Sequence, residues 1–230
     1  MMGFLQNLFK PSGPEGLPVF FNTYLDSVQK IDNRTPIKSL KFVVFDTETT
    51  SLEKDARLLS IGAIKCTTNQ LVISDILDCY VSWEENSEKP KNVEIHGITN
   101  RQSESGVSPE EAIEQFVKFI DGAVLVAQHV DFDVAVVNGI LMKYFKKAQL
   151  RSPFLDTAQL AIRLEQSRFD RSTVDRKQYT LDALMERYKI QPLERHSAIG
   201  DAYCTAILLM KLLSKLEGRG LKTLRDLKTI

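Results

Sequence analysis

Ten residues at positions 41–50, KFVVFDTETT, join a run of apolar β-formers to two carboxylates. Phe42 to Phe45 is continuously apolar, which is typical of a strand buried on both faces of a sheet. Two further strand-like runs cover residues 57–66 and 71–81, and the polar residues 67–70 between them suit a hairpin turn. Three consecutive strands with short connections predict an antiparallel meander.

Helices alternate with strands in the rest of the chain. Ser108, Pro109 and Glu111 supply an N-cap serine, a proline at the first helical position and a glutamate in the first turn, which together predict a helix start. Five more elements follow: strands at 123–127 and 154–155, and helices at 134–145, 181–188 and 199–216. The expected fold class is therefore α/β, with a five-stranded mixed sheet flanked by helices.

Composition places the chain among ordinary globular proteins, with 43% hydrophobic and 26% charged residues in a length of 230. The 30 basic and 30 acidic residues cancel, which excludes a protein that holds nucleic acid by bulk positive charge but not an enzyme with an acidic metal site. The three cysteines, Cys66, Cys79 and Cys204, lie far apart and predict neither a disulfide framework nor a zinc site.

No apolar run reaches the ~18 residues that cross a bilayer, and the N-terminus does not resemble a signal peptide. We therefore expect a soluble, cytoplasmic protein with no membrane partner. Three segments are expected: residues 1–40 as an N-terminal helical extension, residues 41–216 as the main domain and residues 217–230 as a basic C-terminal tail. Phe20 and Tyr24 recur at helical spacing within the extension.

Two carboxylates follow the first strand directly. If the strand continues through Asp46 and Glu48, the two side chains share one face, because alternate residues of a strand point the same way. Like charges on one face repel each other unless a cation lies between them. The Asp-x-Glu pattern alone is also common in solvated loops, so its meaning depends on the other acidic residues.

Two later segments supply those residues. Asp133 begins the helix that follows the short strand, at the kind of place where sites of α/β proteins concentrate, while Asp131 is the better candidate for the N-cap. Asp201 lies in an apolar stretch, where an unpaired carboxylate would be costly. It converges with His196 if the histidine lies in the loop before a late helix and the aspartate in its first turns.

The chain thus contains Asp-x-Glu after a first strand, then Phe-Asp at the start of a middle helix, and then His-x-x-x-x-Asp at the start of a late helix. This order of motifs resembles the DEDDh family of 3′–5′ exonucleases, which includes the proofreading (epsilon) subunit of bacterial replicative DNA polymerase. The resemblance covers about residues 41–216, and IGA at 61–63, HGIT at 96–99 and LDT at 155–157 fall in the same order. A related class of these exonucleases has a catalytic tyrosine four residues before the last aspartate. That position is Ser197 in this chain, which favours the class with a catalytic histidine. The resemblance implies a ribonuclease-H-like fold and phosphodiester hydrolysis by two ions about 4 Å apart.

The resemblance also implies a role for each motif residue. The metal ligands would be Asp46, Glu48, Asp133 and Asp201. Oxygen ligands suit two divalent ions, Mg²⁺ or Mn²⁺, rather than zinc. His196 would be the general base, since an ordinary imidazole can accept the proton of water near neutral pH. The substrate-binding positions would be Thr49, Leu52, His96 and His129.

Two positions depart from the family pattern. Gln128-His129 stands where His-Asn is usual, and Ser51 stands where glycine follows the first motif. The resemblance implies that the first change concerns substrate contacts and not the metal ligand, and that the second concerns the approach of the backbone to the terminal nucleotide.

The sequence thus predicts a metal-dependent exonuclease that releases nucleoside monophosphates from single-stranded DNA ends in proofreading or repair. Two alternatives remain open: an exoribonuclease that trims RNA 3′ ends, and a non-catalytic polymerase-accessory module on the same fold. LQNLF at residues 5–9 is similar to peptides that dock on sliding clamps. A DNA polymerase or a sliding clamp is therefore a candidate partner beside the single-stranded nucleic acid.

Overall fold

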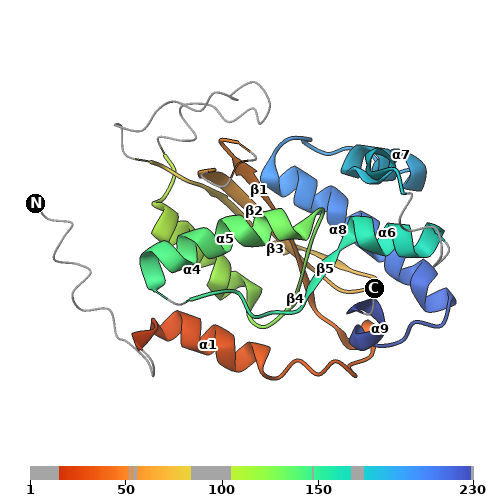
Figure 1. Ribbon diagram of the computed structural model, residues 1–230, viewed down its shortest axis with the longest axis horizontal. Coiled ribbons are helices and arrows are strands. Elements are labelled where there is room, and N and C mark those ends of the chain that lie inside the picture. The colour runs from red at the N-terminus through yellow and green to blue at the C-terminus, as the bar shows by residue number, and fades with distance from the viewer. Residues whose placement is uncertain are drawn as a thin grey trace, which may run out of the picture.

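The computed structural model describes residues 16–51, 53, 56–83, 105–146, 148–166 and 174–228. One five-stranded sheet lies between two layers of helices (Figure 1). The order across the sheet is β3-β2-β1-β4-β5. Its strands are β1 (Phe42–Thr49), β2 (Leu58–Cys66), β3 (Leu71–Tyr80), β4 (Val124–Ala127) and β5 (Phe154–Asp156).

The predicted mixed sheet is confirmed. β1 pairs antiparallel with β2, and β2 pairs antiparallel with β3, which together form the expected meander. β4 pairs parallel with the first half of β1, from Phe42 to Val44, and β5 pairs parallel with β4. Because β4 stops pairing at Val44, the second half of β1 has a free edge on that side.

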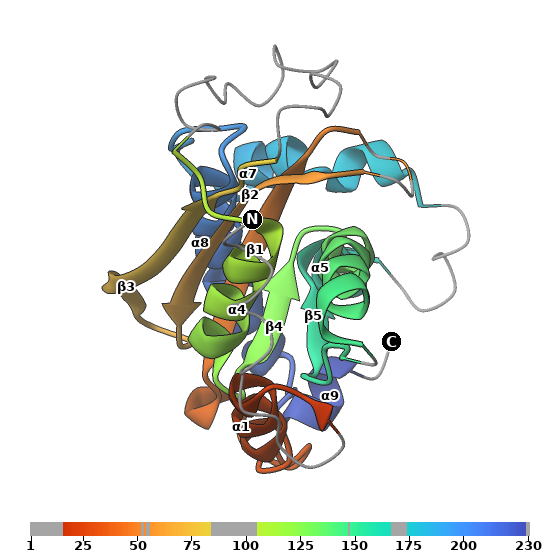
Figure 2. The ribbon, with the colours of Figure 1, turned by 90° about the vertical axis from the view of Figure 1, so that its left-hand side faces the viewer.

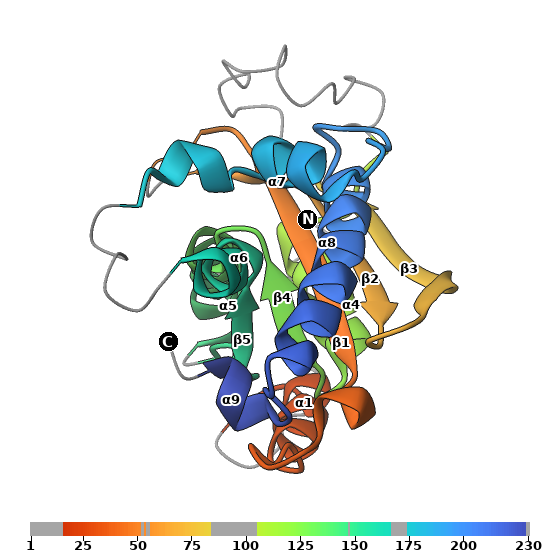
Figure 3. The same cartoon turned by 90° about the vertical axis from the view of Figure 1, so that its right-hand side faces the viewer.

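Helices cover both faces of the sheet (Figures 2 and 3). One layer contains α4 (Pro109–Ile120) and α5 (Val130–Phe145), and the other contains α6 (Thr157–Glu165), α7 (Leu181–Tyr188) and α8 (Ala198–Gly218). The helices α1 (Val19–Val28) and α9 (Leu224–Lys228) lie at the lower end in Figure 1. No helix in the described ranges is long and apolar enough to cross a membrane.

The alternation of β1 divides the core into two clusters. Phe42 and Val44 pack in the cluster that includes α6, α7 and α8, whereas Val43 and Phe45 pack in the cluster that includes α1, α4 and α5. A strand keeps this period of two along its length. Continued past Phe45, the period directs Asp46 and Glu48 toward the α8 side of the sheet.

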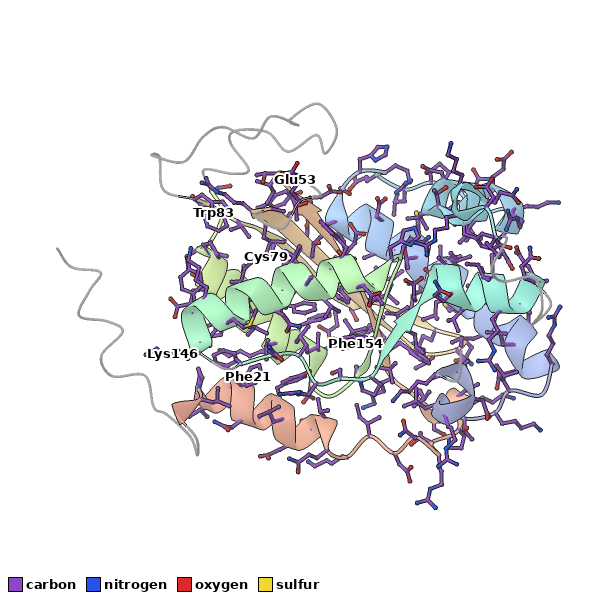
Figure 4. The ribbon with its side chains drawn as sticks, viewed as in Figure 1. Phe21, Glu53, Cys79, Trp83, Lys146 and Phe154 are labelled. Carbon is purple, nitrogen blue, oxygen red and sulfur yellow. The ribbon has the colours of Figure 1, made fainter. Side chains whose placement is uncertain are left out.

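Helix α1 is fixed to the rest of the molecule by buried aromatic side chains. Phe21, labelled in Figure 4, and Tyr24 are almost fully buried. The Tyr24 hydroxyl accepts hydrogen bonds from the backbone N–H groups of Arg151 (2.8 Å) and Ser152 (2.9 Å), just before β5. The LQNLF segment lies outside the described residues.

The structure differs from the sequence-based expectations in local detail. The helix expected from residue 134 starts at Val130, and its N-cap is His129, so the N-cap assignment of Asp131 was wrong. His129 takes a left-handed backbone conformation and makes no side-chain cap bond, which no local preference of the sequence signals. Helix α6 was not expected. The start of α4 is as predicted, with the Ser108 hydroxyl accepting from the Glu111 N–H at 3.2 Å.

Candidate active site

Asp46 and Glu48 occupy the last half of β1, which continues as a strand to Thr49. On β2, Asp46 is opposite Gly62 and Glu48 is opposite Ser60. The register shifts between Glu48 and Thr49, so the pairing becomes irregular directly after the second carboxylate. The two acidic side chains therefore leave the same face of the sheet on the α8 side, as the period of two requires.

Asp201 meets these two carboxylates from the start of α8. One oxygen from each of Asp46, Glu48 and Asp201 lies within 4.8 Å of the other two. The helix start is defined by Ser197, whose hydroxyl accepts from the Gly200 N–H at 3.1 Å, and Asp201 follows in the first turn. Three segments of sequence that are far apart thus converge on one acidic cluster.

Asp133 lies beside this cluster, at the free edge of β1. Its Oδ1 accepts hydrogen bonds from the Thr47 N–H (3.0 Å) and the Thr47 hydroxyl (2.6 Å). β4 pairs with β1 only as far as Val44. Asp133, in the first turn of α5, therefore accepts the hydrogen bond of a backbone N–H on the part of β1 that β4 leaves unpaired. Asp133 is outside the close group of three, but its charge raises the pKa values of both Asp46 and Glu48.

The carboxyl groups of the site have raised pKa values. Burial raises the pKa of Glu48 to about 7, with a further contribution from the charge of Asp133, while Arg195 opposes the shift. Burial also raises the pKa of Asp133 to about 7, against the lowering effect of its Thr47 hydrogen bonds. The pKa of Asp46 lies well above its ordinary value, first through burial and then through the neighbouring carboxylates. Negative charge on these carboxyl groups is therefore costly in the absence of a cation.

The donor set fits a hard divalent cation. Carboxylate oxygens are the ligands that Mg²⁺ and Mn²⁺ prefer, and three of them lie close enough to share an ion. A bound cation would also remove the electrostatic cost that raises the pKa values of these groups. Asp46, Glu48 and Asp201 are thus suited to hold one ion, and Asp133 lies outside this group of three.

Arg195, which no motif in the sequence singled out, lies within this acidic environment. Its guanidinium donates to the Asp201 carboxylate, and its Nε also donates to Asp182 of α7 at 2.9 Å. The Arg195 side chain is only 17% exposed. Its position immediately before His196 was the available signal, but no pattern in the chain alone links it to Asp182. Arg195 partly neutralises the cluster and connects α7 to the start of α8.

His196 lies in the loop before α8, as expected, with a left-handed backbone (φ 66°). This loop folds back closely over the helix start, since a Cβ on Gly200 would lie 2.3 Å from the Glu194 carbonyl oxygen. The His196 side chain is exposed. Within the part of the chain that the structure describes, it makes no hydrogen bond or ion pair with the acidic cluster. Its role as general base stays a prediction.

Of the four predicted substrate-binding residues, Thr49 and His129 lie in the described part of the chain. Thr49 follows the acidic end of β1 and donates its hydroxyl to the Ser51 carbonyl at 2.6 Å, and His129 is an exposed residue at the start of α5. Leu52 and His96 lie outside the described residues.

Figure 4 places Glu53 and Trp83 at the same edge of the molecule, and the Trp83 indole donates to the Leu58 carbonyl at 2.8 Å.

A polar network fixes the starts of α5 and α6. Asp156 at the end of β5 accepts from the Val130 N–H (3.1 Å) and, with its other oxygen, from the Ala158 N–H (2.8 Å). Gln128 donates to the Tyr179 carbonyl at 2.7 Å and accepts from the Thr157 hydroxyl at 2.5 Å. Gln128 therefore connects the end of β4 to Thr157 at the start of α6 and to the Tyr179 carbonyl.

This chain is similar in sequence to exonucleases and to DNA polymerase III proteins. The exonuclease family RNase_T matches residues 43–209. The chain is 33% identical over 196 residues to a DNA polymerase III subunit epsilon-like protein of Rhodobacter capsulatus, covering 82% of this chain and 26% of that protein. It is 31% identical over 194 residues to a PolC-type DNA polymerase III of Caldanaerobacter subterraneus subsp. tengcongensis, covering 83% of this chain and 13% of that protein. The chain thus spans about a quarter or less of these two curated relatives.

Solved structures share the fold at low identity. The nuclease domain of 3′hExo, a DEDDh family member bound to rAMP, superposes with a TM-score of 0.61 at 16% identity, over 76% of this chain and 92% of that chain. E. coli Exonuclease I in complex with a dT13 oligonucleotide superposes with a TM-score of 0.63 at 16% identity, over 79% of this chain and 43% of that chain. The sheet and its helical layers are therefore those of DEDDh exonucleases.

Proposed function

The chain belongs to the RNase T family of exonucleases, and from this membership we propose that it is a metal-dependent 3′–5′ exonuclease acting on single-stranded DNA ends. The observation that carries the proposal is the convergence of Asp46, Glu48 and Asp201 within 4.8 Å, with Asp133 beside them. Relatives named as DNA polymerase III proteins favour DNA over RNA as the substrate. The names of the same relatives support proofreading or repair as the proposed role.

The reaction adds water across the bond between phosphorus and the 3′ oxygen of the preceding nucleotide. It releases a nucleoside 5′-monophosphate and leaves a new 3′ hydroxyl on the shortened strand. When bound, Mg²⁺ or Mn²⁺ would activate the attacking water and neutralise the charge that develops on the leaving 3′ oxygen. The ligands would be Asp46, Glu48, Asp133 and Asp201.

The chain's own side chains supply the remaining chemistry. His196 would accept the proton of the attacking water, a role that suits an imidazole in an exposed loop. Thr47 holds the Asp133 carboxylate through two hydrogen bonds, which fixes the orientation of that ligand. Thr49 directly follows Glu48, and His129 precedes Asp133 by four residues, and both would contact the terminal nucleotide.

The test is a digestion of end-labelled oligonucleotides. Purified protein with Mg²⁺ or Mn²⁺ should shorten a single DNA strand from its 3′ end and release monophosphates. Chelation with EDTA should stop the reaction. Matched DNA and RNA strands in parallel digests report the preferred nucleic acid.

A matched pair of variants separates the proposed site from its surroundings. Asp133→Asn should reduce the rate by at least about a hundredfold, whereas Asp131→Asn, an exposed acid two residues earlier in α5, should leave it unchanged. Equal activity in wild type and Asp133→Asn would refute the assigned chemistry. Digestion from the 5′ end would refute the polarity.

A further inference from the structure

A groove remote from the acidic cluster lies among α6, α7 and the second half of α8. It encloses about 1170 Å³ and is lined by residues of those helices and by Thr68 of the β2–β3 turn. Figure 3 views this side of the molecule, with α8 descending from the loop that carries His196. The groove and the acidic cluster share one face of the sheet and one helix.

Positive charge lines this groove. Lys211 and Lys215 of α8 and Arg219 at its C-cap recur every four residues, and Lys189 lines the groove from the C-cap of α7. All four are exposed, and none forms an ion pair within the part of the chain that the structure describes. Lys215 and Arg219 lie at the C-terminal end of α8, where the helix dipole favours cations, whereas Lys211 lies before the last turn and gains little from it.

The acidic residue that lines the groove is already neutralised. Glu165 of α6 pairs with Arg187 (2.6 Å) and accepts from the Tyr188 hydroxyl (2.9 Å). It therefore leaves the charges of Lys189, Lys211, Lys215 and Arg219 uncompensated. A ligand that enters the groove meets a surface of net positive charge.

The geometry of α8 indicates what fits there. Four residues of a helix rise by about 6 Å, so Lys211, Lys215 and Arg219 present cations at regular intervals along one line. A phosphodiester backbone carries regularly repeated negative charges and can follow such a line. Lys211 lies roughly 15 Å and Arg219 roughly 27 Å along the helix from Asp201, so a strand held at the acidic cluster would extend several nucleotides to reach them.

We propose that this basic groove binds the backbone of the substrate strand upstream of the nucleotide being removed. The inference rests on the proposed exonuclease function and extends it, because it gives the enzyme a second contact that only long strands reach. The groove would increase affinity for the strand without taking part in the chemical step.

The test compares the triple variant Lys211→Gln/Lys215→Gln/Arg219→Gln with wild type on a long thymidine oligonucleotide and on a thymidine trinucleotide. Loss of three phosphate contacts should weaken binding of the long strand roughly ten- to hundredfold at about 0.1 M salt. The slope of log affinity against log salt should fall by about two. The trinucleotide is too short to span both sites and reports whether the acidic cluster has been disturbed.

The control variant is Lys118→Gln/Lys143→Gln/Lys146→Gln, which removes three cations from α4 and the end of α5 on the opposite face. It should bind the long strand as wild type does. The proposal is overturned by unchanged binding of the long strand in the groove variant, by an equal loss in the control, or by an equal loss for the trinucleotide. It is also overturned if an acidic peptide, and not the oligonucleotide, depends on the three groove residues.

These outcomes are distinct from failure of the proposed function. Binding is measured with Ca²⁺ or EDTA, under conditions in which no cleavage is needed. If wild type shortens no strand, the exonuclease proposal fails. If wild type shortens both strands and the groove variant binds them as well as wild type, only the groove proposal fails.

Discussion

Gly62 of β2 lies so close to the first turn of α8 that a Cβ at this position would be 2.2 Å from the backbone nitrogen of Ile199. Gly62 is also the partner of Asp46 in the β1–β2 pairing. The missing side chain lets the helix start approach the sheet next to Asp46. This approach brings Asp201 within reach of the two carboxylates of β1.

Gly62→Ala should therefore separate α8 from β2 and open the acidic cluster. We expect a loss of about 1–3 kcal/mol in the free energy of unfolding, because the methyl group meets backbone rather than a flexible side chain. Nuclease activity should fall with it. Gly139→Ala is the matched control, since its Cβ would meet nothing within 4 Å, and it should keep its activity and gain up to about 1 kcal/mol. Equal effects of the two substitutions would contradict this account.

Thr47→Val should loosen Asp133 without changing the shape of the strand. The substitution removes the hydroxyl donor to Oδ1 and leaves the backbone donor in place. We expect a loss of about 1–3 kcal/mol in stability and a weaker affinity for Mn²⁺, measured by denaturant unfolding and titration calorimetry. Thr47→Ser retains the hydroxyl and should restore both quantities. A valine variant with wild-type Mn²⁺ affinity would show that Thr47 does not position the carboxylate.

The stability of the metal-free protein should fall as the pH rises from the ordinary carboxyl range, about 4, to about 7. Glu48 and Asp133 have pKa values raised to about 7 in the folded state. Between the ordinary carboxyl pKa and this value the folded state binds more protons than the unfolded state, so stability decreases with increasing pH. We expect a change on the order of 2 kcal/mol, followed as the melting temperature in EDTA.

Glu48→Gln should flatten this pH dependence, because glutamine does not titrate. Glu186→Gln, an exposed residue of α7, serves as the control and should keep the wild-type slope. Saturating Mg²⁺ or Mn²⁺ should also flatten the slope, since a cation stabilises the charged carboxylates. A melting temperature that rises through this pH range would contradict the assignment.

Arg195→Gln should make the protein more dependent on divalent cations. Arg195 pairs with both Asp201 and Asp182, and its loss leaves the Asp201 carboxylate without this partner. The metal-free protein should lose about 2–4 kcal/mol of stability, and Mn²⁺ should raise its melting temperature more than that of wild type. Arg34→Gln, which breaks an exposed pair with Asp32, should change neither value. An unchanged response to Mn²⁺ would show that Arg195 does not compensate the cluster.

His196→Ala should lower kcat by at least about a hundredfold while changing Mn²⁺ affinity little, as expected for a general base. His129→Ala should instead raise KM, since His129 is predicted to contact the terminal nucleotide. Single-turnover kinetics and Mn²⁺ titration separate these effects. A loss of Mn²⁺ affinity as large as the loss of kcat would reject His196 as the base.

Local sequence patterns were sufficient to predict features that lie within a single strand or at a single helix start. The apolar run Phe42–Phe45 predicted β1, and the period of two predicted that Asp46 and Glu48 share a face. Ser108 predicted the start of α4 through a contact within a single helical turn. These features depend on neighbours in sequence, which propensity and periodicity describe directly.

The sequence by itself determined the strands of the meander, the mixed α/β class and the identity of the acidic motif residues. Only the tertiary structure decided that Asp133 bonds to Thr47, that Arg195 joins Asp182 to Asp201, and that Gly62 admits the start of α8. It also aligned the cations of α8 along a groove formed with α6 and α7. The physical reason is that each of these relationships joins residues of different elements, and their distance is set by how helices pack on a twisted sheet rather than by any preference of the residues themselves.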